Sequence, residues 1–357
     1  MKSFPHFNLS ERNTFRMKVS CALYVEIETE SDLPALDWDA LPQPVMVMGG
    51  GSNLLFTKDF PGTVLHVGID RNLPLQAGAG VHKSLKGDRT VTLGAGVVFD
   101  DFCAWAAAVG LWGPENLSLI PGEVGASAVQ NIGAYGVEAK DIITGIRAWD
   151  REERRFVEID PADCAYGYRT SRFKHEWKGR YIITAVTYRL SKKPQPKLDY
   201  GGVRKALEMA GHAVIPGSAG NLTPQMIRDT IIDIRRQKLP DPEVLGSAGS
   251  FFCNPVISRK HFEQIVTTAR QDHGPEYQVP HFEVGDQIKV PAAWMIDQCG
   301  FKGRTLGGAQ VYPMQPLVIV NASGEATPQE IIGLEQQVIQ AIENKYGITL
   351  HPEVEHV

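Results

Sequence analysis

Short apolar runs separated by glycine-rich turns mark the first half of the chain. One run at residues 45–48 leads into a triple glycine, and another lies at 63–67. Apolar runs bounded by turn residues predict β-strands. Between residues 99 and 109 the apolar positions recur at helical spacing, which predicts a helix that Gly110 ends. We therefore expect strands, a tight glycine loop and a helix in this region.

Further strand-like runs lie at residues 91–93, 142–149, 155–159 and 181–190. The segment 192–197 holds two prolines and three lysines, which suit neither a strand nor a helix interior. It is the expected hinge between an N-terminal α+β layer and a more helical C-terminal part.

Helices are expected at four places beyond this hinge. Thr223 and Ser258 are candidate N-caps, and a shorter helix is expected at residues 291–299. The last helix has the clearest signals, because Thr327 opens a capping box and Gly347 supplies a C-terminal stop. The tail that follows is expected to be extended.

The composition is that of an ordinary soluble globular protein, with 357 residues and a net charge of −5 at pH 7. This length allows two or three domains, and the charge gives no reason to expect a nucleic-acid partner. The five cysteines are widely spaced without a Cys-x-x-Cys pair, which argues against a disulfide framework and a structural zinc site. No secretory signal or membrane-spanning stretch is recognisable, so we expect a cytoplasmic protein without membrane or metal partners.

Two loops carry very little side-chain bulk, and the first follows the strand at 45–48. Its residues Gly49, Gly50, Gly51, Ser52 and Asn53 can present consecutive backbone N–H groups to a phosphate. The loop is not the Gly-x-Gly-x-x-Gly fingerprint, and a triple glycine by itself is equally compatible with a plain turn.

The second loop lies within residues 120–136 and contains Gln130 and Asn131, whose amides can read the edge of a planar ring. A buried crossover, where two backbones pack closely, is the alternative interpretation. Two such loops on one domain favour a large planar cofactor. The residues of this loop that we expect to contact it are Pro121, Gly122, Gly125, Ala126, Gln130, Asn131, Ile132 and Gly133.

Five motifs, in the same order along the chain, resemble the UDP-N-acetylenolpyruvoylglucosamine reductase (MurB) family. They are the two glycine loops, the segment 166–175 with the pattern Tyr-Arg-x-Ser-x-Phe-Lys, the segment 248–255 with Ala-Gly-Ser-Phe-Phe-x-Asn-Pro, and Pro-Glu-Val at 352–354. Together they span nearly the whole chain, and their order is more specific than any one motif.

The resemblance implies an α+β fold with an FAD-binding domain of the vanillyl-alcohol oxidase (PCMH) type. This domain is expected at residues 1–200, in two lobes of about 1–70 and 71–200. A substrate-binding α+β domain is expected at 201–357, with its C-terminal helix and tail returning to the active site. FAD is expected to be non-covalent, since neither glycine loop holds a His or Cys. The resemblance also implies NADPH as the hydride donor.

The reaction implied is the reduction of an enol ether beside a carboxylate, which needs a hydride, stabilisation of developing charge, and a proton. The family pattern assigns the charge stabilisation to Arg169 with Glu353 beside it, and the proton to Ser250, since a held hydroxyl can protonate a basic enolate carbon. Taken singly, such an arginine is more often a solvated ion-pair partner. A tail glutamate is normally solvated, and a serine in a glycine-rich turn is normally structural.

The family pattern also implies a set of substrate contacts. Cys253 stands where many relatives carry a lysine, which removes one cation without changing the chemistry. Tyr200 matches the tyrosine that closes over the uridine diphosphate in the type I branch. The full set of expected substrate contacts is Tyr135, Tyr168, Tyr200, Lys238, Asn254 and Gln298.

The sequence thus predicts a cytoplasmic, monomeric enzyme that reduces UDP-N-acetyl-3-O-(1-carboxyvinyl)-glucosamine to UDP-N-acetylmuramate for peptidoglycan synthesis. One alternative is a flavin oxidase of the same superfamily that acts on an alcohol or sugar. The motifs around Ser250 and Glu353 argue against it. Another alternative is a non-catalytic nucleotide-binding protein, which the presence of all three expected catalytic side chains disfavours.

Overall fold

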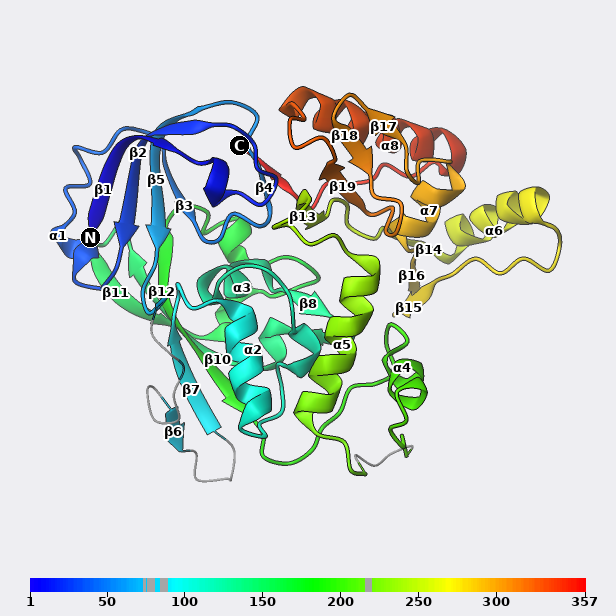
Figure 1. The fold of residues 1–357 in the computed structure, drawn as a ribbon, viewed down its shortest axis with the longest axis horizontal. Helices are drawn as coiled ribbons and strands as arrows, with labels where there is room; N and C mark the ends of the chain where they lie inside the picture. Colours follow the sequence, from blue (N-terminus) through cyan, green and yellow to red (C-terminus); the bar gives the residue numbers. More distant parts are fainter. Residues whose placement is uncertain (73–74, 76–80, 84–88, 216–219) are drawn as a thin grey trace. The chain divides into compact units, whose positions relative to one another are not determined.

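A computed structural model describes residues 1–72, 75, 81–83, 89–215 and 220–357 of the chain (Figure 1). These residues form two compact units. Unit 1 comprises Met1–Leu9, Ser20–Gly51 and Asp59–Gln237, and unit 2 comprises Ser10–Val19, Ser52–Lys58 and Lys238–Val357. The domain boundary expected at residue 200 stays a prediction.

One sheet of unit 1 is built on parallel strands, in the order β1–β2–β5–β3. β1 (Lys2–Asn8) is antiparallel to β2 (Ser20–Ile27), and β5 (Phe60–Val67) is parallel to both β2 and β3 (Val45–Met48). β5 is buried along most of its length, as is usual for a central parallel strand. The strands expected at 45–48 and 63–67 are confirmed. The apolar pattern does not predict β1, because this strand is exposed at nearly every position.

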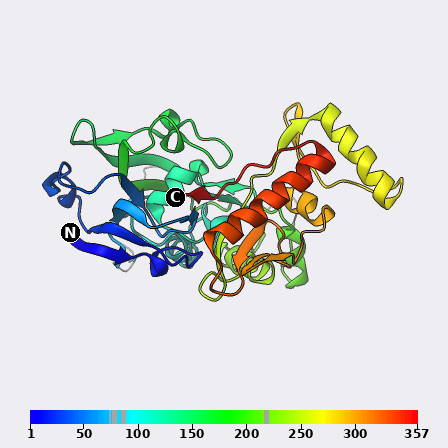
Figure 2. The same ribbon diagram turned by 90° about the horizontal axis from the view of Figure 1, so that it is seen from above.

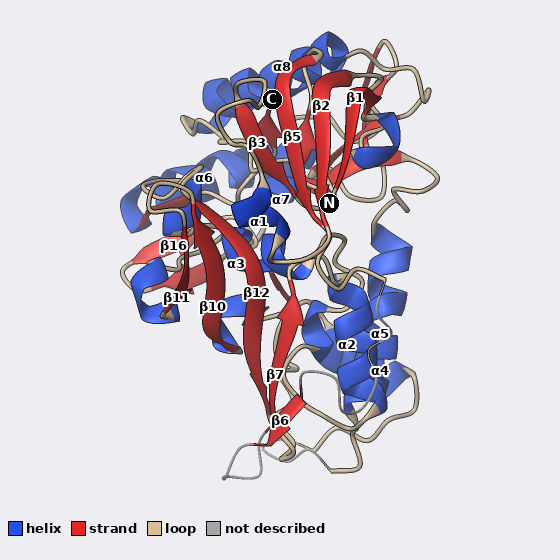
Figure 3. Cartoon of the chain, turned by 90° about the vertical axis from the view of Figure 1, so that its left-hand side faces the viewer, coloured by secondary structure: helices blue, strands red, loops and turns tan. Residues whose placement is uncertain are grey.

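The other large sheet of unit 1 is antiparallel, in the order β11–β10–β12–β7–β6 (Figure 3). It confirms the four strands expected between residues 91 and 190. Their bounds are β6 Val81–Lys83, β7 Arg89–Gly94, β10 Ile143–Asp150, β11 Arg155–Ile159 and β12 Tyr181–Leu190.

A hydrophobic core joins the two sheets of unit 1 with helix α2 (Phe99–Ala108), which confirms the predicted helix. The ring of Tyr188 on β12 stacks on Phe102 of α2, with centroids 4.7 Å apart. The Tyr188 hydroxyl lies 2.9 Å from that of Ser127 in α3 (Val124–Gln130). This buried hydrogen bond therefore fixes α3, which lies within the second glycine loop, to the sheet.

A smaller core of unit 1 lies around α4 (Val203–Met209) and α5 (Pro224–Lys238). Arg228 of α5 makes a two-pronged ion pair with Asp100 of α2, with Nη1–Oδ1 and Nη2–Oδ2 distances of 2.5 and 2.9 Å. Both side chains are largely shielded, so this contact ties α5 to α2 within the unit.

Unit 2 contains an antiparallel sheet in the order β13–β19–β18–β17, on which α8 (Pro328–Tyr346) packs (Figure 2). Thr327 and Glu330 form the predicted capping box, and Gly347 ends α8 in the left-handed conformation. Ser258 caps α6 as predicted. The remaining bounds are β13 Gly246–Ser250, β14 Val256–Ser258, α6 Arg259–His273, β15 Phe282–Val284, β16 Gln287–Lys289, α7 Ala292–Gln298, β17 Thr305–Leu306, β18 Ala309–Val311 and β19 Val318–Asn321.

The tail of unit 2 is extended, as expected, and forms a two-stranded parallel pairing. β20 (Glu355–His356) pairs with β4 (Leu54–Leu55). Among the residues that the structure describes, no helix has the length and apolar character needed to span a bilayer. The short elements of the chain are α1 Asp32–Ala35, β8 Gly133–Ala134, β9 Val137–Glu138, and 3-10 turns at Ser10–Arg12, Glu115–Leu117, Ala139–Asp141, Pro161–Cys164 and Arg172–Lys174.

Candidate active site

The first glycine loop leaves β3 and lies against the second within unit 1. A Cβ added to Gly50 would lie 3.5 Å from Cα of Gly122. A Cβ on Gly49 would lie 3.3 Å from Cβ of Ala126 and 3.3 Å from Oε2 of Glu123. The two expected cofactor loops are thus brought together at Gly49–Gly50. Their backbones approach closely because side chains are small or absent.

A buried histidine–glutamate contact supports this approach of the two loops. Nε2 of His66, on β5, lies 3.0 and 3.1 Å from the two carboxylate oxygens of Glu123. Arg71 also approaches Glu123, with an Nη1–Oε1 distance of 3.7 Å. The His66 and Glu123 side chains are only 1% and 4% exposed, so a buried carboxyl group lies beside the loop expected to hold phosphate.

The second loop is connected to the segment that carries Arg169. Asn131 ends α3 in the left-handed conformation, with φ of 45°, and is buried. Its amide donates to the carbonyl oxygen of Gly167 (2.8 Å) and to Oε2 of Glu138 (2.9 Å), and its Oδ1 accepts from the Lys140 amide (3.0 Å). The Asn131 side chain therefore links the end of α3 to Gly167, two residues before Arg169, and to the segment at residues 138–140.

Gln130 makes a similar connection, because its Oε1 accepts a 2.9 Å hydrogen bond from Nζ of Lys174. Lys174 also donates to the carbonyl oxygen of Arg169 (3.3 Å). Arg169 itself adopts φ of +57° in a tight turn closed by a bridge between Gly167 and Thr170. A non-glycine residue in this region is strained, and such strain often accompanies functional sites.

Arg169 acts electrostatically on one aromatic residue, Tyr200, and on one cation, Arg235, of unit 1. Burial raises the pKa of Tyr200, and the charge of Arg169 opposes that rise. Burial lowers the pKa of Arg235, which the Tyr135 hydroxyl raises and the Arg169 charge lowers further. The positive charges of Arg169 and Arg235 repel each other, and an anion bound between or beside them would relieve this repulsion. Arg235 is not among the residues predicted from the sequence.

Tyr135 and Tyr200, both expected substrate contacts, meet through neighbouring glycines. A Cβ on Gly201 would lie 2.7 Å from Cδ1 of Tyr135, and a Cβ on Gly136 would lie 3.3 Å from Cβ of Tyr200. The structure therefore places these two rings on adjoining turns. Tyr168 is also at the surface, 42% exposed.

Ser250 ends β13 in unit 2, opposite Val318 of β19. The preceding Gly249 has φ of +72°, which glycine adopts without strain. Phe251 and Phe252 are buried, while Ser250 itself is partly exposed. The Phe-Phe pair thus anchors the chain in the core and leaves the serine accessible.

Glu353 lies on the segment next to this strand, also in unit 2. Its backbone N–H donates to the carbonyl oxygen of Phe251 over 2.8 Å, and Phe252 forms a bridge with Pro352. Nδ2 of Asn53 donates to the carbonyl oxygen of Glu353 over 3.1 Å. Unit 2 therefore brings together three of the predicted segments, around Ser250, Glu353 and Asn53. Arg169 belongs to unit 1, and its convergence with the other two catalytic residues stays a prediction.

The remaining expected substrate contacts lie in unit 2, and two of them have protein partners. Oδ1 of Asn254 accepts from the Ala292 amide at the start of α7 (2.8 Å), and Gln298 at the end of α7 bonds to His273. Lys238 is exposed at the end of α5. Within the described parts of the chain, no cluster of His, Cys, Asp and Glu side chains resembles a metal site.

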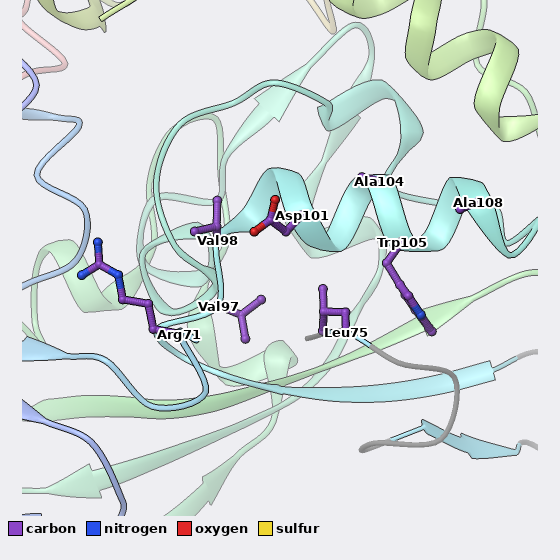
Figure 4. Close-up of a pocket in the computed structure, with 8 residues that line it drawn as sticks. All are labelled: Arg71, Leu75, Val97, Val98, Asp101, Ala104, Trp105 and Ala108. Carbon is purple, nitrogen blue, oxygen red and sulfur yellow. The ribbon is translucent and has the colours of Figure 1, made fainter. Parts of the chain in front are cut away.

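A cavity of about 460 Å³ lies beside α2 in unit 1 (Figure 4). Trp105 and Asp101 of α2 line one wall, with Val97, Val98 and Arg71 around them (Figure 4). None of the residues predicted for the site lines it. It adjoins the second glycine loop, since Val98 forms a bridge with Glu123.

Two family models of known proteins match two separate parts of the chain. Residues 22–157 match the family model of an FAD binding domain. Residues 241–357 match that of the UDP-N-acetylenolpyruvoylglucosamine reductase C-terminal domain. The UDP-N-acetylenolpyruvoylglucosamine reductase of Bacteroides fragilis (strain YCH46) is 44% identical, covering 98% of this chain and 99% of its own length. The chain belongs to the UDP-N-acetylenolpyruvoylglucosamine reductase family. The corresponding reductase of Porphyromonas gingivalis (strain W83) is 40% identical, with 98% of each chain covered.

Solved structures agree with this assignment at the level of the fold. The MurB reductase of Thermus caldophilus matches with a TM-score of 0.63 at 22% identity, covering 99% of this chain and 98% of that one. The 6-hydroxy-D-nicotine oxidase of Arthrobacter nicotinovorans matches with a TM-score of 0.50 at 12% identity, covering 98% and 86%. The predicted α+β fold with an FAD-binding domain is confirmed, and the vanillyl-alcohol-oxidase type of that domain stays a prediction. As a member of this family the chain is an FAD-dependent oxidoreductase, as predicted.

Proposed function

We propose that this chain catalyses the NADPH-dependent reduction of UDP-N-acetyl-3-O-(1-carboxyvinyl)-glucosamine to UDP-N-acetylmuramate in peptidoglycan synthesis. Family membership supplies the reaction class. The observation that carries the assignment of roles is the 2.8 Å hydrogen bond from the Glu353 amide to the Phe251 carbonyl. It puts the expected proton donor and the expected tail carboxylate on neighbouring segments.

The two glycine loops fit a large planar dinucleotide. The approach of Gly50 to Gly122 leaves backbone N–H groups accessible where side chains would otherwise stand. What FAD supplies when bound is hydride transfer, first from NADPH and then to the methylene carbon of the enolpyruvyl group. The residues that would hold it are Gly49, Gly50, Gly51, Ser52, Asn53, Pro121, Gly122, Gly125, Ala126, Gln130, Asn131, Ile132 and Gly133.

Three side chains complete the reaction. Arg169 binds the substrate carboxylate, because a guanidinium matches a carboxylate with two parallel hydrogen bonds. Glu353 orients Arg169, whose positive charge stabilises the negative charge that develops on the carboxylate side of the substrate. Ser250 then donates its hydroxyl proton to C2 of the substrate and is reprotonated from solvent. The hydride on one carbon and the proton on the other saturate the double bond.

The nucleotide part of the substrate is bound by aromatic and polar side chains that are exposed or half-buried. Tyr135, Tyr168 and Tyr200 cover the uridine and sugar, while Lys238, Asn254 and Gln298 bind the diphosphate and sugar hydroxyls. Arg235 is a further cation for this anionic ligand, because it lies within the electrostatic reach of both Arg169 and Tyr135.

An anaerobic absorbance experiment tests this function. The purified protein should be yellow, NADPH should bleach the flavin band, and the enolpyruvyl sugar nucleotide should restore it. UDP-N-acetylglucosamine, which lacks the enolpyruvyl group, is the matched control and should leave the band bleached. Recovery with the control, or none with the substrate, contradicts the proposal.

We also infer a monomer in the cytoplasm. The supporting observations are the five free cysteines, three of them buried, and a nucleotide-sugar substrate that cells make in the cytoplasm. Light scattering of the purified holoenzyme tests the monomer, and fractionation of the native host tests the compartment. A stable dimer or a membrane-bound fraction contradicts this inference.

A further inference from the structure

A carboxylate is buried on the apolar face of the last helix in unit 2. Glu335 of α8 is 5% exposed, and the other inward residues of that face include Leu334 and Val338, both fully buried. Burying a charged group among apolar side chains is costly unless a partner of opposite charge accompanies it. The position of Glu335 therefore requires a partner, and the apolar repeat of α8 alone would favour a hydrophobic residue there.

The partner comes from the C-terminal tail. Nε2 of His356 lies 3.2 Å from Oε2 of Glu335, and the two side chains are 32% and 6% exposed. The contact is close but is not aligned as a hydrogen bond. Glu335 raises the pKa of His356 above its ordinary value of 6.5. Two apolar residues also lie beside His356: Leu55 is its strand partner, and the centroid of the Phe251 ring lies 6.2 Å from that of His356.

The pair stands at the end of a short strand. β20 is only two residues long. The Glu355 amide donates to the Asn53 carbonyl (3.0 Å), the Val357 amide to the Leu55 carbonyl (2.9 Å), and the amide and hydroxyl of Thr57 to the Val357 carbonyl (2.7 and 2.8 Å). Strands this short contribute little stability by themselves. Glu353 precedes His356 by three residues, and its own backbone bonds to Phe251 and Asn53. A displacement of β20 therefore pulls on the segment that these bonds hold in place.

We propose that the Glu335–His356 pair is a positioning device that anchors the C-terminal tail to α8 and thereby holds Glu353 beside the Ser250 strand. This rests on the proposed function, in which Glu353 takes part in the reaction. Neither Glu335 nor His356 belongs to the motifs that carry the family resemblance. The proposal makes them positioning residues, because they act through the tail and not on the substrate.

The pair also makes the anchor sensitive to pH. The pKa of His356 is raised in the folded chain, so the contribution of the pair is complete below the ordinary value of 6.5. It is lost as the pH rises through the raised pKa, since neutral His356 leaves the Glu335 charge buried without a cation. The tail should therefore loosen on the alkaline side of that transition.

The experiment compares Glu335→Gln, His356→Phe and the double variant Glu335→Leu/His356→Phe in the holoenzyme. Each single variant should slow the substrate-dependent reoxidation of the flavin by about 10- to 100-fold, as expected for a displaced catalytic group. NADPH reduction should be unchanged. Hydrogen exchange at the Glu355 and Val357 amides should accelerate. Glu343→Gln, an exposed glutamate of the same helix, is the matched control and should resemble the parent.

The double variant replaces the ion pair by apolar groups of similar volume, which often restores packing. It should recover most of the rate and lose the alkaline decline of the reoxidation step. Parent-like single variants, equal slowing of both half-reactions, or a folded double variant that stays slow overturns the proposal. Glu353→Gln separates the two levels of inference. If it is fully active, the role proposed for Glu353 fails; if it is inactive while both single variants match the parent, only the anchor fails. If the parent enzyme shows no flavin recovery with the enolpyruvyl sugar nucleotide, the proposed function itself fails.

Discussion

The amide of Glu353 donates a 2.8 Å hydrogen bond to the carbonyl oxygen of Phe251. This contact joins the last residues of the chain to a strand one hundred positions earlier, within unit 2. Ser250 precedes Phe251, so the two motifs lie next to each other through their backbones. The expected proton donor and the expected tail carboxylate, from distant parts of the sequence, thereby come within one folded unit.

Replacing Arg169 by lysine tests the role of its planar guanidinium. Lysine keeps the charge but loses the two-pronged geometry, so substrate-dependent flavin reoxidation should fall by about 10²- to 10³-fold. Reduction by NADPH should be retained. Arg172→Lys is the matched control, since Arg172 stacks over Trp177 at 5.4 Å and has no assigned role. Equal behaviour of the two variants in stopped-flow absorbance argues against a specific role for Arg169.

Asn131 should be important for stability because its amide connects three backbone or side-chain groups in unit 1. Asn131→Ala should lower the free energy of unfolding by about 3 kcal/mol, from lost hydrogen bonds and from alanine at a positive φ. Asn131→Gly accepts that backbone conformation and should lose about 2 kcal/mol. Urea unfolding measures both. A glycine variant less stable than the alanine variant is the contrary result.

The His66–Glu123 pair should control FAD affinity. His66→Asn removes the ring nitrogen that contacts the buried Glu123 carboxylate, so this carboxylate stays beside Gly49 without that partner and repels the cofactor diphosphate. Glu123→Gln removes that negative charge and should bind FAD more tightly than His66→Asn does. Quenching of flavin fluorescence by the apoprotein gives the two dissociation constants. The reverse order of affinities contradicts this account of the loop.

Stability at low pH should depend on Asp100. Burial pushes the pKa of this carboxyl upward, but hydrogen bonds from Arg228 and from the Leu119 amide outweigh it, and the pKa is lowered overall. A lowered pKa stabilises the fold above the ordinary value, and this contribution is lost as the pH falls through the lowered one. The melting temperature of the parent should therefore fall more steeply below pH ~4 than that of Asp100→Asn. Parallel curves for the two holoenzymes exclude this contribution.

Local signals in the sequence predict those features that depend on a few neighbouring residues. Thr327 with Glu330 specifies the start of α8, and Gly347 specifies its end, because capping is a matter of adjacent backbone and side-chain groups. The glycine loops are recognisable for the same reason. Their mutual contact at Gly50 and Gly122 could be expected only from the family resemblance.

Features that depend on tertiary packing are absent from the local pattern. His356 and Glu335 look like solvated residues until the fold places them 3.2 Å apart. Arg235 is one of several cationic residues near the end of α5. Only its interactions with Tyr135 and Arg169, which depend on the fold, distinguish it from the others. The polar strand β1 has no apolar alternation and is stabilised by its pairing with β2.

The most direct test of the central claim is the Ser250→Ala variant in anaerobic stopped-flow absorbance. NADPH should bleach its flavin at the parent rate, because the hydroxyl takes no part in that step. Recovery of the flavin band on adding the enolpyruvyl sugar nucleotide should then be slower by about 10²- to 10⁴-fold, the usual contribution of a positioned general acid. Recovery at the parent rate contradicts the account, because protonation of C2 would then need no group at position 250.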